Sequence, residues 1–201
     1  MKRIAALVTM IVLALGGTAH AASYDAAQAQ ALLDKAVKAA GPGFTVNAAA
    51  SQGPAAFTAT TPAGVTAAEQ YKVVGTGTRL LNGGPDGKGY LTGLSVSLGQ
   101  TETAASAVAF WKATETRVNG FSYGPTVGPP TGFATTKIRG RPVTTYQQAT
   151  SPRGDSTLDS TKVLAAFVDG RSVLTLTVDN SDPAQAMTLL KNWISRYLKK
   201  S

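Results

Sequence analysis

The chain has 201 residues, and its 19 lysines and arginines against 11 aspartates and glutamates give a formal net charge of +8 at neutral pH. It contains no cysteine and one histidine, His20. Disulfides and thiol chemistry are therefore excluded, and a single histidine near the N-terminus leaves little basis for a catalytic triad or a histidine-ligated zinc site.

The first residues have the features of a secretory signal peptide, which we predict over residues 1–21. A positive start at Lys2 and Arg3 precedes an apolar run over residues 4–15, and the motif Ala19-His20-Ala21 matches a signal peptidase site. The apolar run is too short for a transmembrane helix, which takes about 20 residues. Cleavage after this motif would remove the only histidine.

We expect residues 22–201 to form one exported domain, periplasmic or secreted, with no transmembrane segment. Without histidine or cysteine, this domain is predicted to have no catalytic residues, no metal site and no cofactor. A Ser-Lys pair or paired carboxylates remain open as the chemistry of a histidine-free hydrolase.

The first predicted helix covers residues 24–40, with Ser23 as its N-cap and small apolar residues along one side. The motif Gly41-Pro42-Gly43 ends it. Short strands are expected at residues 44–50 and 55–60.

A hairpin and a second helix follow. Val- and Thr-rich residues 71–81 and alternating residues 90–98 predict two strands around a glycine-rich turn. Thr101 or Thr103 is expected to cap one helix over residues 102–118. The predicted apolar face of this helix comprises Ala104, Ala107, Val108, Trp111 and Val118.

A Gly- and Pro-rich loop at residues 121–132 precedes the last strands and helix. Phe121 and Tyr123 in this loop indicate either a functional loop or, the interpretation we favour, two anchors that hold the connection to the core. Four strands are then predicted, at residues 133–138, 142–150, 161–169 and 171–179.

The final helix, predicted over residues 183–199, has the clearest local signals. Asp182 is the expected N-cap and Pro183 the first helical residue. One half of its surface is apolar, which predicts docking on the sheet in preference to a membrane surface. The elements together predict an α+β fold in which a mainly antiparallel sheet is packed by helices in a single domain.

Three segments from residue 90 onward resemble the PsbP-like α/β/α sandwich family. They are "YLTGLSVSL", "IRGRPVTTYQQAT" and "KVLAAFVDGRSVLTLTVDNSDPAQAMTLLKNWISRYL". The resemblance implies an antiparallel sheet between helical layers. It also implies a non-catalytic adaptor, assembly or binding protein of a lumen, periplasm or cell envelope.

Arg139, Arg141 and Arg153 form a local basic cluster around a predicted strand connection. They are the candidate binding residues, for an anionic head group or phosphate, although a merely solvated basic face is the simpler interpretation. Aromatic residues do not alternate with these arginines as on a base-stacking surface, so nucleic acid is not an expected partner.

The sequence thus predicts a non-catalytic binding or interaction protein of the bacterial cell envelope, with an envelope protein, an anionic small molecule or a lipid as partner. Two alternatives stay open. One is an envelope-surface protein that holds anionic lipid or polysaccharide through its basic residues. The other is the histidine-free hydrolase.

Overall fold

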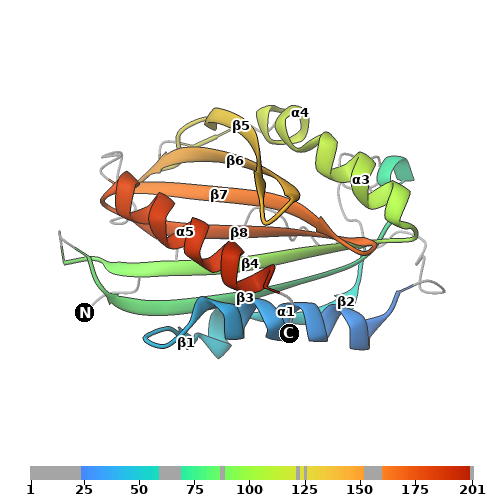
Figure 1. Ribbon diagram of the computed structural model, residues 1–201, viewed down its shortest axis with the longest axis horizontal. Helices are drawn as coiled ribbons and strands as arrows, with labels where there is room; N and C mark the ends of the chain where they lie inside the picture. Colours follow the sequence, from blue (N-terminus) through green and yellow to red (C-terminus); the bar gives the residue numbers. More distant parts are fainter. Residues whose placement is uncertain are drawn as a thin grey trace.

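The structure of the protein is a computed structural model, and it describes residues 24–58, 69–86, 89–120, 123–124, 126–151 and 160–199. These residues form one antiparallel sheet of eight strands packed by helices, which confirms the predicted α+β single-domain fold (Figure 1). The predicted signal peptide and Arg153 lie outside the described residues.

The strands follow the order β1-β3-β4-β8-β7-β6-β5 across the sheet, and β2 also pairs with β3. Their bounds are β1 Thr45–Val46, β2 Gln52–Ala56, β3 Val73–Pro85, β4 Leu91–Thr101, β5 Thr131–Ile138, β6 Arg141–Thr150, β7 Ser160–Asp169 and β8 Ser172–Asn180. The helices are α1 Ala26–Ala40, the 3-10 helix η2 Ala48–Ala50, α3 Ala104–Lys112, α4 Thr114–Asn119 and α5 Pro183–Tyr197.

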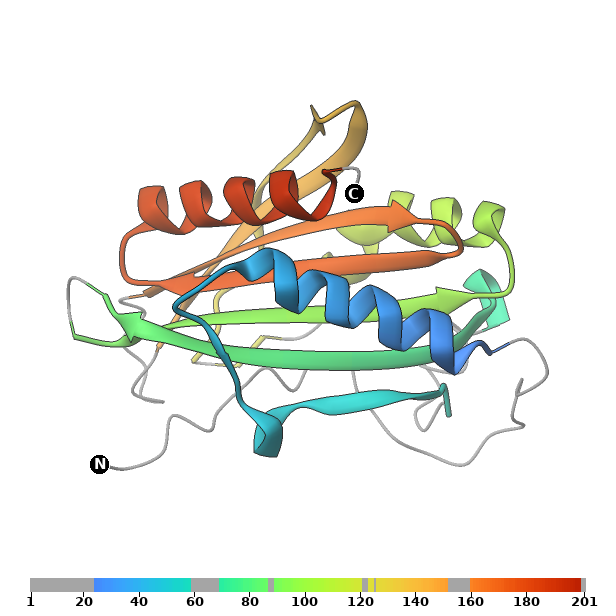
Figure 2. The same ribbon diagram turned by 60° about the horizontal axis from the view of Figure 1, so that its bottom comes forward.

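Helices cover both faces of the sheet, and β8 shows how. Successive side chains of a strand point to opposite faces. Leu174 enters the large hydrophobic core beneath α1 and α5, whereas its neighbour Val173 joins a smaller cluster with Phe110 of α3. We call the side of α1 and α5 the front face and the side of α3 and α4 the back face (Figure 2).

The front core is held by large side chains from α1, α5 and the central strands. Leu33, Phe167, Trp193 and Tyr197 are at most 1% exposed. The Trp193 indole N–H donates a buried hydrogen bond of 2.7 Å to the Ala36 carbonyl, which ties α5 to α1. A buried indole usually finds such a partner, because leaving its N–H unpaired is costly.

The helix ends follow local chemistry. Asp182 caps α5 by accepting hydrogen bonds from the N–H groups of Ala184 and Gln185, and Pro183 begins the helix as expected. At α1 the cap is Asp25 instead of the predicted Ser23, because the Asp25 carboxylate accepts from the Gln28 N–H at 2.9 Å.

The prediction of one continuous helix over residues 102–118 is wrong. Thr103 caps α3, but the helix ends at Lys112 and α4 starts at Thr114. The Thr114 hydroxyl donates a hydrogen bond of 2.6 Å to the Trp111 carbonyl, so it satisfies a backbone acceptor at the junction between the two helices. Val108, placed on the predicted apolar face, is 38% exposed, and Phe110 is buried in its stead.

The predicted strands near the N-terminus also differ from the structure. Residues 44–50 form only the two-residue β1 followed by η2, and the next strand, β2, starts at Gln52 and includes Pro54. Strand β3 continues through the predicted glycine turn to Pro85. The residues of β1 and β2 have only a weak alternating apolar pattern, so their pairing with β3 decides where these two strands end.

None of the helices in the described ranges combines the length and apolar character that a membrane crossing requires.

Candidate functional site

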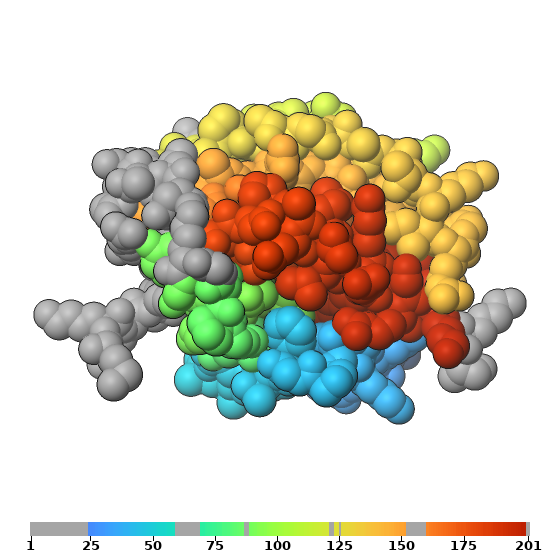
Figure 3. Space-filling model, turned by 60° about the vertical axis from the view of Figure 1, so that its left-hand side comes forward, coloured from blue at the N-terminus to red at the C-terminus, as the bar shows by residue number. Residues whose placement is uncertain are grey.

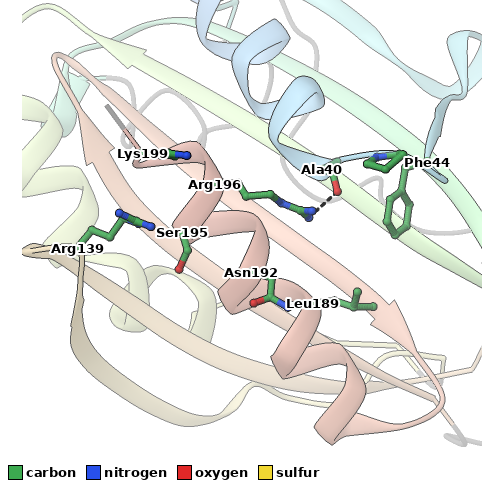
Figure 4. A pocket seen from close by; sticks show the side chains of 9 residues that line it. Ala40, Phe44, Arg139, Leu189, Asn192, Ser195, Arg196 and Lys199 are labelled. Carbon is green, nitrogen blue, oxygen red and sulfur yellow. Dashed lines mark hydrogen bonds between the residues drawn. The ribbon is translucent and has the colours of Figure 1, made fainter. Parts of the chain in front are cut away.

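An open groove of about 500 Å³ runs along the side of α5 that faces away from the sheet. It lies between the C-terminal end of α1 and the turn from β5 to β6 (Figure 4). In Figure 3, α5 is exposed between the segment after α1, in blue, and the strands β5 and β6, in yellow and orange. The lining residues are Ala40, Pro42, Phe44, Arg139, Leu189, Asn192, Ser195, Arg196 and Lys199.

The spacing of residues along α5 sets which side chains face the groove. Leu189, Asn192 and Arg196 recur every three or four residues, so they share one face of the helix, and Lys199 lines the groove from just beyond the end of α5. The buried residues of α5 occupy the opposite face, against the sheet. The outward-facing half of the amphipathic helix α5 therefore forms the floor of the groove. The segment after α1 and the β5–β6 turn form its two sides.

Arg139 reaches the groove because of an unusual turn. Ile138 pairs with Arg141 across the hairpin, which leaves Arg139 and Gly140 as the two turn residues, and both have positive φ angles, +50° and +79°. This is the pattern of a type I′ turn, where Asn-Gly is the usual choice. An arginine in this conformation is strained by about 1 kcal/mol. Residues with strained backbones cluster at functional sites, which makes Arg139 a candidate.

Arg196 links α5 to the end of α1. Its guanidinium donates a hydrogen bond of 2.6 Å to the Ala40 carbonyl, one of the last carbonyls of α1 (Figure 4). A cation at this position also interacts favourably with the negative end of the helix dipole. A Cβ atom on Gly41 would lie 2.6 Å from the same guanidinium, so a larger residue there would displace the Arg196 side chain.

The groove is basic and partly apolar. Arg139, Arg196 and Lys199 contribute positive charge, and none of the described residues that line it is acidic. Phe44 and Leu189, both partly buried against the front core, add apolar surface. This combination suits an anionic group joined to an apolar body.

Arg141 has a different environment from Arg139. Its guanidinium donates to the Val168 carbonyl at 2.9 Å and forms an ion pair of 3.2 Å with Asp169. The Asp169 carboxylate also accepts from the Tyr197 hydroxyl at 2.8 Å and lies 3.7 Å from the Lys35 ammonium. Arg141 therefore belongs to a network that holds the β5–β6 hairpin to β7 and, through Asp169, to α5 and α1.

The structure places Arg139 and Arg141 in different environments and does not describe Arg153. Arg139 lines the groove, Arg141 pairs with Asp169, and Arg153 lies outside the described residues. A binding role for the three as a group stays a prediction. Sequence reasoning missed Arg196 and Lys199, whose only signal was their place on the polar face and last turn of the final helix.

The groove also contains the residue types of a Ser-Lys pair. Ser195 lies in the last turn of α5 and Lys199 follows the helix, and no hydrogen bond joins them in the described structure. Within the described ranges, no three carboxylates or histidines gather closely enough to hold a metal ion.

Comparison with known proteins gives a fold likeness and no family. No family model and no curated protein matches the chain. Among solved structures, the extracellular domain of PknH from Mycobacterium tuberculosis resembles it with a TM-score of 0.55 and 9% sequence identity, over 90% of this chain and 100% of that domain. At this identity the likeness concerns the fold.

Proposed function

We propose that this protein is a non-catalytic binding domain that works outside the cytoplasm and holds an anionic group in the groove beside α5. The observation that carries the proposal is that Arg139, from a strained turn, Arg196 of α5 and Lys199, which follows α5, line one groove. None of the described residues around it supplies a neutralising carboxylate.

Location outside the cytoplasm is supported by two independent features. One is the predicted signal peptide, and the other is the fold shared with an extracellular domain. Fold likeness names no ligand, so the groove alone indicates the ligand chemistry. Mass spectrometry of the exported protein tests the location, since we expect its first residue to be Ala22.

The anionic group we propose is phosphate-like and joined to an apolar portion. Arginine binds phosphate oxygens through its planar N–H donors, and lysine adds a point charge. Phe44 and Leu189 provide the apolar contact. A lipid headgroup and a free phosphorylated small molecule share this chemistry, and a binding experiment distinguishes the two sources.

The experiment measures co-sedimentation of the protein with phosphatidylcholine vesicles that contain or lack phosphatidylglycerol. A double variant, Arg139→Gln with Lys199→Gln, should bind the anionic vesicles about tenfold less tightly or worse, since each basic residue near an anionic surface contributes about 1 kcal/mol. Binding should also fall at high salt. If the groove prefers a free anion, inorganic phosphate in solution will bind and compete with the vesicles.

A matched control removes the same charge elsewhere. Lys72 and Lys112 are exposed near the back face, and Lys72→Gln with Lys112→Gln should leave binding within about twofold of the unaltered protein. Equal losses in the two double variants would show that net charge, and not the groove, governs binding. That result would contradict the proposal.

A further inference from the structure

A second cluster lies on the back face, around Arg117 of α4. The Arg117 guanidinium carbon lies 3.9 Å from the centre of the Phe110 ring, a close cation–π contact. Phe110 packs against Tyr71, with ring centres 5.4 Å apart. Tyr146 of β6 packs with Val118, the residue after Arg117, and the charge of Arg117 acts on both Tyr71 and Tyr146. We call Tyr71, Phe110, Arg117 and Tyr146 the Arg117 site.

Arg117 differs from the other arginines whose contacts are described. Arg79, Arg141 and Arg196 each donate hydrogen bonds to carbonyl or side-chain oxygens. The Arg117 Nε is buried without an acceptor, and no carboxylate in the described structure pairs with its guanidinium. Burial lowers the pKa of Arg117, which still remains charged at neutral pH.

An unpaired charge in such surroundings destabilises the free protein. Water is partly excluded by the aromatic rings, so the guanidinium loses solvation, and the cation–π contact offsets only part of that loss. Even a paired buried charge often adds no net stability over apolar residues of similar size, so an unpaired one is not expected to stabilise the free protein. A bound anion would pair with the Arg117 guanidinium and so offset the destabilisation that this buried charge causes in the free protein.

We propose that Arg117 anchors a small monocarboxylate ligand with a flat apolar body on the back face of the sheet. The planar guanidinium matches a carboxylate through two parallel hydrogen bonds, and the partly buried ring of Tyr71 offers contact for an apolar ligand. The Arg117 site contributes one positive charge, which a monoanion balances. Because α5 lies on the front face, this site is separate from the groove.

Isothermal titration calorimetry with sodium benzoate tests the proposal, and benzamide serves as the neutral probe of the same shape. We expect benzoate to bind and to raise the melting temperature of the unaltered protein, as any ligand of the folded state does. Benzamide should bind at least tenfold more weakly. Arg117→Gln should abolish benzoate binding, and Arg117→Lys should weaken it at least tenfold, because lysine lacks the planar pair of donors.

Three controls keep the outcome clear. Arg139→Gln, in the groove, should leave benzoate binding unchanged, so the two proposals fail independently. Nuclear magnetic resonance of the unaltered protein should show the Arg117 Nε–H signal moving with benzoate, even if Arg117→Gln does not fold. Inorganic phosphate should not displace benzoate. Equal binding of benzoate and benzamide, no movement of the Arg117 signal, or displacement by phosphate would overturn the proposal.

Discussion

Two buried tyrosines, one on each face of the sheet, differ in what surrounds their hydroxyl groups. Tyr197 on the front face donates to Asp169, and both burial and the negative charge of that carboxylate raise the pKa of Tyr197. Tyr146 on the back face has no such acceptor among the described residues. Burial raises its pKa to about 12, although the nearby Arg117 charge opposes the shift.

The raised pKa of Tyr146 predicts a loss of stability in alkali. The unfolded chain releases this proton near pH 10, whereas the folded protein holds it until about pH 12. The stabilisation from Tyr146 is therefore complete below pH 10, and about 2 to 3 kcal/mol of it is lost as the pH rises to 12. Urea unfolding of Tyr146→Phe between pH 9 and 12 should show a correspondingly smaller decline than the unaltered protein. Parallel declines would contradict the assignment.

At the scale of elements, the junction of α1 and α5 both holds the two helices together and lines the groove. Arg196 donates to the last carbonyl of α1, and the chain then leaves the helix through Gly41 with a φ angle of +90°. Gly43 has a similar φ of +92°, but a Cβ atom there would meet nothing within 4 Å. A comparison of substitutions at these two glycines therefore distinguishes the cost of backbone strain from the cost of disturbing Arg196.

We predict that Gly41→Ala costs more than Gly43→Ala. Both variants place an alanine at positive φ, which costs about 1 kcal/mol. Only Gly41→Ala also pushes the Arg196 guanidinium off the Ala40 carbonyl, which should add about 1 kcal/mol and weaken anion binding in the groove. Urea unfolding and vesicle binding of the two variants measure the difference. Equal losses would mean that Arg196 has no special contact at this junction.

The elements that the sequence predicted well are those whose signals are local. The cap at Asp182 and the proline after it depend on neighbouring residues, and α5 follows them. The β7–β8 hairpin, predicted as strands 161–169 and 171–179, is likewise formed by segments next to each other in the chain. The break between α3 and α4 depends in addition on tertiary contacts. Trp111 donates its indole N–H to the Ala166 carbonyl of β7 at 2.9 Å, a partner that helical spacing alone does not reveal.

The candidate sites were harder to predict than the fold for the same reason. Arg139 and Arg196 belong to a hairpin and a helix far apart in the chain, and only the completed sheet brings them to one groove. Arg117 has the pattern of an ordinary exposed helical arginine. Its position over Phe110 depends on the break between the two helices, which the sequence did not indicate.

At the scale of the whole molecule, one sheet joins the two helical layers. Trp193 reports on the front layer and Trp111 on the back layer. We predict that Trp111→Phe and Trp193→Phe, each retaining one tryptophan, unfold in urea with fluorescence transitions that coincide with circular dichroism, since a single domain unfolds cooperatively. If the fluorescence transition of either variant precedes its circular dichroism transition, the helical layer that contains the remaining tryptophan unfolds separately from the sheet.

The strand order has a consequence for how the molecule is made. Strand β8 is separated in the chain from β4 by α3, α4 and the strands β5 to β7, yet it pairs with β4 on one side and β7 on the other, so it closes the centre of the sheet. Such distant pairings make folding slow. Until β8 has emerged from the ribosome, β4 lacks the neighbour that joins the β1–β4 half of the sheet to the β5–β7 half. The front core, which contains side chains from β4, β7 and β8, can therefore be completed only after these strands have paired.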